Sequence, residues 1–131
     1  MGIIDIFYNE FNRWRDEKKE RNEIKLGVNN ALRKSLIKLE FIWDDMILTG
    51  AYSIDEKMYF LSNISEELMN IAVELNDFLD KEIIDKLREI SVDLKRLSRI
   101  PKTMTVSKRI QEEGEKILKK VNDLKDKVGK D

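Results

Sequence analysis

The chain contains no cysteine and no histidine among its 131 residues. Disulfides, thiolate nucleophiles and iron–sulfur clusters require cysteine, and structural zinc sites draw mainly on these two side chains. Histidine is also essential to the Ser-His-Asp triad and to the Glu-x-x-His motifs of di-iron helical proteins. These absences leave carboxylates, Lys, Arg, Tyr, Ser and Thr for any chemistry. We therefore predict no metal site, no cofactor and no catalytic residue.

Proline and glycine are also scarce, with one proline and five glycines in the whole chain. Few turns can therefore interrupt the chain, while 39% of the residues are charged. A length of 131 residues is typical of one domain, and the high charge fits long helices with a solvated outer face.

Long apolar runs are absent too, since no stretch approaches the roughly 18 residues that a membrane span requires. The N-terminal apolar stretch contains Asp5 and Glu10, which is unlike a signal peptide. Ile6 occupies the position where a myristoylation motif has Ser or Thr. From these features we expect a soluble, cytoplasmic protein.

What the sequence does contain is an apolar residue at every third or fourth position, which is the helical period. The pattern predicts four long helices, at about 24–49, 54–79, 81–99 and 105–128. Residues 1–23 precede them as a separate N-terminal helix that is amphipathic and then charged. Because the linkers are short, antiparallel neighbours are favoured. The predicted fold class is all-α: an antiparallel up-down four-helix bundle over residues 24–131, with an additional N-terminal amphipathic helix.

Local signals support these helices. Ser53 and Glu56 have the spacing of a capping box, and Asp80 and Thr105 stand where the next two helices require N-caps. Pro101 ends the fourth helix at or before the preceding residue.

The same periodicity predicts which side chains face inward. Leu68 and Leu94 fall at the centre of two apolar stripes, and Met46 continues the stripe of the second helix. Gly114 falls on the inner face of the last helix, where the missing side chain lets a neighbouring helix approach closely.

The first candidate site is an aromatic stripe near the N-terminus. Its members step by three, four and three residues: Ile4, Phe7, Phe11 and Trp14. The following segment, 15–23, has no apolar side chain, so the stripe has no continuation. Aromatic anchors are typical of protein interfaces. The stripe therefore packs on its own domain, on a second chain or, less consistently with its acidic polar side, on a membrane surface.

The second candidate is a group of cations around Pro101 that contains no acidic residue: Lys95, Arg96, Arg99, Lys102, Lys108 and Arg109. Residues 51–94 carry 4 basic and 11 acidic side chains, whereas residues 95–131 carry 12 basic and 6 acidic. This asymmetry indicates oppositely charged helices lying side by side, or a site for an anion, a nucleic acid or a membrane surface. No aromatic residue lies within 95–109 to stack on a base.

Two pairs of carboxylates form the third candidate: Glu40 with Asp44, and Glu74 with Asp77. Acidic pairs on neighbouring helices hold Mg²⁺ in some all-α phosphohydrolases. A hairpin between the second and third helices, however, would place these pairs several turns apart. We interpret them as parts of a solvated acidic face.

The favoured functional hypothesis is a non-catalytic helical-bundle protein that binds another protein, including a second copy of itself as a homodimer. The alternative is a nucleic-acid or polyanion binder through residues 95–109. A carboxylate-based, metal-dependent phosphohydrolase is the third hypothesis.

Overall fold

The computed structural model describes residues 3–16 and 21–128. Their secondary structure is helical, with no strand in either described range. The five α-helices are α1 (Ile3–Asp16), α2 (Arg21–Trp43), α3 (Ile54–Glu74), α4 (Lys81–Leu97) and α5 (Val106–Lys127). A π-helical turn, Asp44–Leu48, follows α2, and a 3-10 turn, Asn76–Phe78, follows α3. The predicted all-helical class is confirmed.

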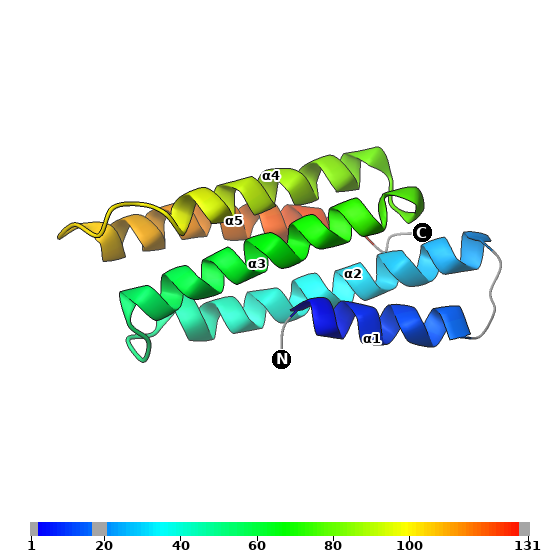
Figure 1. Cartoon of the computed structure of the whole chain (residues 1–131), viewed down its shortest axis with the longest axis horizontal. Coiled ribbons are helices and arrows are strands. Elements are labelled where there is room, and N and C mark those ends of the chain that lie inside the picture. The colour runs from blue at the N-terminus through cyan, green and yellow to red at the C-terminus, as the bar shows by residue number, and fades with distance from the viewer. Residues whose placement is uncertain (1–2, 17–20, 129–131) are drawn as a thin grey trace.

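The helices lie side by side along the long axis of the molecule, and successive helices run in opposite directions (Figure 1). α3 packs along α4, α4 packs along α5, and α2 contacts α5. The shorter α1 lies beside the first part of α2 and also contacts α3. Within the described residues, no helix combines the length and apolar content needed to cross a bilayer.

The interior is apolar and continuous, and Leu68 and Leu94 at its centre are both fully buried, as the periodicity predicts. Two small polar residues lie between α3 and α4. The hydroxyl of Ser65 donates to the Ser91 carbonyl at 2.6 Å, and the Ser91 hydroxyl donates to the Ser65 carbonyl at 2.6 Å. This reciprocal pair leaves neither buried hydroxyl without a partner, and the small side chains allow close contact between the helices.

The predicted cap of α3 is confirmed. The Ser53 hydroxyl accepts from the Glu56 amide at 3.2 Å, and the Glu56 carboxylate accepts from the Ser53 amide at 3.1 Å. Asp80 and Thr105 occupy the N-cap positions of α4 and α5, but neither side chain caps its helix. The Asp80 carboxylate instead accepts a hydrogen bond from Lys25 at 3.0 Å.

Gly114 has the role that its position predicts. It is buried against the indole of Trp43, and a Cβ added there would lie 2.9 Å from Trp43 Cζ2. The large side chain on α2 therefore fills the space that α5 leaves open.

The apolar stripe of α2 continues into the π turn after Trp43. Leu39, Trp43 and Ile47 are buried at steps of four residues, and Ile47 is only 4% exposed. Met46, beside Ile47, is partly buried and packs against the same core. The predicted continuation of the stripe at Met46 is therefore confirmed in part.

Candidate protein-interaction groove

The aromatic stripe of α1 packs against its own chain. Phe7 and Phe11 are buried, and the Phe11 ring lies 6.4 Å from that of Phe78, in the 3-10 turn after α3. Tyr8, next to Phe7, donates a hydrogen bond to the Glu74 carboxylate of α3. These contacts place α1 in a groove between α2 and α3. The apolar surface of Phe7 and Phe11 is thus already covered within one chain, while the Ile4 and Trp14 side chains lie outside the described part.

α1 is too short to cover the whole groove. Its 14 residues extend about 21 Å, whereas the 23 residues of α2 extend about 35 Å before the π turn adds to them. Figure 1 shows the N-terminal end of α1 near the middle of α2. The remainder of the groove, toward the α2–α3 connection, has no helix over it in the described structure.

This remainder is a shallow hollow, which we call the open groove. It is lined by Met46 from the π turn and by five residues of α3: Asp55, Glu56, Tyr59, Phe60 and Asn63. Asn63 precedes Glu74 by eleven residues, which is three helical turns, so the two lie on the same face of α3. The open groove therefore continues the groove that α1 occupies.

The floor of the open groove is aromatic. Phe60 packs edge-on against the buried Trp43, with ring centroids 6.4 Å apart. Tyr59 is 71% exposed, which is unusual for a large aromatic side chain on a regular helix. Apolar side chains that gather at the surface, as Met46, Tyr59 and Phe60 do here, are typical of interaction sites.

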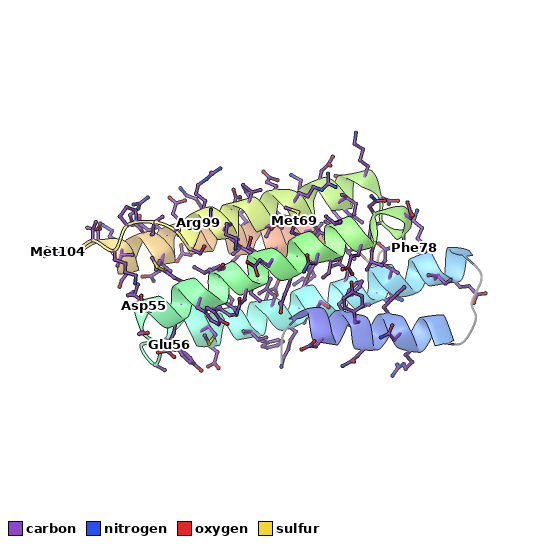
Figure 2. All side chains as sticks on the ribbon, viewed as in Figure 1. Asp55, Glu56, Met69, Phe78, Arg99 and Met104 are labelled. Atoms are coloured by element: carbon purple, nitrogen blue, oxygen red, sulfur yellow. The ribbon has the colours of Figure 1, made fainter. Side chains whose placement is uncertain are left out.

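The edge of the open groove is acidic. Asp55 and Glu56 line it at the start of α3 (Figure 2). Both carboxylates have partners, since Asp55 pairs with Lys102 and Glu56 belongs to the capping box. Both remain exposed to solvent, so a ligand in the open groove would meet an apolar floor and a negative edge.

Sequence reasoning missed Met46, Tyr59 and Phe60 as site residues. Met46 packs against the core and also lines the open groove, and apolar spacing gives no sign of the second role. Tyr59 and Phe60 did carry a signal. They stand between the buried residues Met58 and Leu61, so at least one of them has to face outward.

The six predicted cations divide into two sets. Lys95 donates to Ser62 and Glu66 of α3, at 2.8 and 3.1 Å, and Lys102 pairs with Asp55. Lys108 lies 3.9 Å from Glu112 on its own helix. The other three, Arg96, Arg99 and Arg109, form no ion pair within the described residues and are exposed.

Charge pairing also joins α4 to α5. Lys120 of α5 donates to Asp93 at 2.6 Å and to Glu89 at 3.4 Å. The hydrogen bond to Asp93 raises the pKa of Lys120, and the hydrogen bond from Lys120 lowers the pKa of Glu89. At the far end, Lys127 lowers the pKa of Glu82 in the same way. The charge asymmetry of the sequence thus reflects in part acidic helices lying beside basic ones.

The four predicted carboxylates do not come together. Glu40 faces α5 and accepts from Lys125 at 3.1 Å, whereas Glu74 accepts from Tyr8 of α1. Asp44 and Asp77 are exposed on different turns. Across residues 3–16 and 21–128, no three acidic side chains converge as a metal site would require.

Comparison of the chain with known protein families, with curated protein sequences and with solved structures gives no match. We therefore infer the function from the geometry and chemistry of the surface itself.

Proposed function

We propose that this chain is a non-catalytic protein-interaction module that binds an amphipathic helix of another protein in the open groove. The observation that supports the proposal is the division of one groove into two parts. α1 already binds in the first part through its aromatic side chains, while the second part keeps an exposed apolar floor. Helix-in-groove binding is a common mode of peptide recognition, with apolar anchors spaced by three and four residues.

The edge of the open groove indicates the chemistry of the partner. Two acidic residues, Asp55 and Glu56, favour a helix with Lys or Arg beside its apolar anchors. The same charges disfavour two open grooves facing each other, because like-charged edges would meet. We therefore propose a partner of different sequence over a second copy.

Two finer predictions from the sequence remain part of this proposal. We describe α2–α5 as an antiparallel up-down four-helix bundle to which α1 is added, and we propose a cytoplasmic location. Self-association through Ile4, Phe7, Phe11 and Trp14 would have to expose Phe7 and Phe11, which are buried in the single chain.

The proposal can be tested with two model peptides of equal length. One helix presents Leu on one face and Lys on the other, and the second carries Glu in place of Lys. We expect saturable binding of the Leu–Lys peptide and much weaker binding of the Leu–Glu peptide in isothermal titration calorimetry. Equal affinity for both peptides would contradict the role of the acidic edge.

Matched substitutions locate the binding site. Tyr59→Lys introduces a charge into the open groove. It should weaken the binding of the Leu–Lys peptide by about tenfold or more, as loss of an aromatic anchor does. Val73→Lys makes a similar change at another exposed position of α3, outside the lining of the open groove, and should leave affinity unchanged. An equal loss of affinity in the two variants would show that the peptide does not bind in the open groove. A homodimer in sedimentation equilibrium that Tyr59→Lys dissociates would replace the proposed partner with a second copy.

A further inference from the structure

Three arginines that take no part in helix pairing surround two adjoining hollows on the α4–α5 side of the molecule. The first is a cleft of about 330 Å³ between the helices, with Arg96 from α4 and Arg109 from α5 in its lining. Its floor includes Leu97, Ile100 and Ile117. The second hollow shares Arg96 and Ile100 with the first and adds Arg99.

The charges in the first cleft do not cancel. Asp93 is held by Lys120 at 2.6 Å, and Glu113 lies 3.9 Å from Lys116, so these four side chains form two opposite-charge pairs. Arg96 and Arg109 remain without an acidic partner within the described residues. Together with Arg99 they give the paired hollows three uncompensated positive charges.

Arginine differs from lysine in what it can recognise. Its planar guanidinium donates two parallel hydrogen bonds to one oxyanion and is always charged. Two guanidiniums from neighbouring helices in one cleft suit a ligand with two adjacent anionic groups.

We propose that this arginine cleft binds a compact diphosphate-bearing anion, with Arg96 and Arg109 as the main ligands and Arg99 at the edge. A hollow of about 330 Å³ suits a compact ligand rather than a long polyanion that runs across the surface. The cleft also has no aromatic side chain on which a base could stack. Both features favour a small ligand over a nucleic acid, and the proposal is independent of the open groove.

Titration calorimetry with inorganic pyrophosphate and with ADP, at low and at physiological salt, tests the proposal. Binding of both anions would show that the diphosphate group itself is recognised. Binding of ADP alone would show that the diphosphate must be part of a nucleotide. We expect Arg96→Gln and Arg109→Gln each to weaken binding by about tenfold, the usual effect of removing a charge-assisted hydrogen bond.

Lys81→Gln is the matched control, because it removes one exposed charge at the opposite end of α4 and should leave affinity unchanged. Each variant should keep the melting temperature of the wild type, since the three substituted side chains are exposed. The proposal is overturned if neither anion binds saturably at low salt, or if Lys81→Gln weakens binding as much as Arg96→Gln. It is also overturned if a short single-stranded RNA binds more tightly than both anions with the same dependence on Arg96 and Arg109.

Discussion

The two parts of the α2–α3 groove carry similar aromatic side chains but differ in what covers them. Under α1, Phe11 and Phe78 are in contact and Phe7 is fully buried. In the open groove, Phe60 rests on Trp43, yet Tyr59 beside it is 71% exposed. The difference shows that aromatic content alone does not decide whether such a surface is core or interface. The deciding factor is the length of α1, which covers only part of α2 and so leaves the rest of the surface exposed.

The largest expected effect is the contrast between Phe7 and Tyr59. Phe7→Ala removes a fully buried ring and should lower the free energy of unfolding by about 3–5 kcal/mol. Tyr59→Ala removes a mostly exposed ring and should change it by less than about 0.5 kcal/mol. Urea denaturation followed by circular dichroism measures both values. Similar losses for the two variants would mean that the open groove belongs to the core, and the comparison would then fail.

Gly114→Ala tests the packing beneath the open groove. Its expected effect on stability is smaller than that of Phe7→Ala. The new Cβ would press on Trp43, which also carries Phe60, so both rings would have to move. Overpacking costs about 1–3 kcal/mol, of which the better helix propensity of Ala returns about 1 kcal/mol.

Gly50→Ala is its control, because nothing lies within 4 Å of a Cβ at Gly50. We therefore expect thermal denaturation to show a lower melting temperature for Gly114→Ala and no loss for Gly50→Ala. A Gly114→Ala protein as stable as the wild type would show that Trp43 is free to shift.

The smallest expected effect concerns the α4–α5 ion pairs, which lie outside both parts of the groove. The lowered pKa of Glu89 means that its contribution to stability is present above its ordinary value of 4.5 and is lost as the pH falls through the folded-state value. The raised pKa of Lys120 has the opposite consequence. Its contribution is present below 10.5 and is lost as the pH rises through the folded-state value.

Glu89→Gln should therefore lose less stability than the wild type when the pH is lowered from about 7 to about 3.5, and added salt should reduce the difference because the pair is exposed. Melting temperatures at the two pH values provide the measurement. An unchanged acid sensitivity in Glu89→Gln would show that the pair does not contribute to holding α5 on α4.

Apolar spacing was sufficient to predict the helical class and the centre of the core. Leu68 and Leu94 are buried because each belongs to an uninterrupted stripe with a period of three and four. The Ser53–Glu56 cap and the contact at Gly114 were predictable because each depends on a few residues close in sequence or on a single missing side chain.

The candidate sites were less predictable, because each depends on which segments meet. The sequence could not show whether Phe7 and Phe11 would find a groove within their own chain. Nor could it show that Lys95 and Lys102 would pair with α3 while Arg96 and Arg109 would not. Those outcomes depend on which helices lie close together in space. The spacing of apolar residues along the sequence does not specify this.

Met46 has one further consequence for this surface. Its side chain packs on the core and lines the open groove at the same time, so a substitution there acts on stability and on the groove together. Because methionine is unbranched and adapts its shape to its neighbours, this wall of the groove can change its form without a change in the helix backbone.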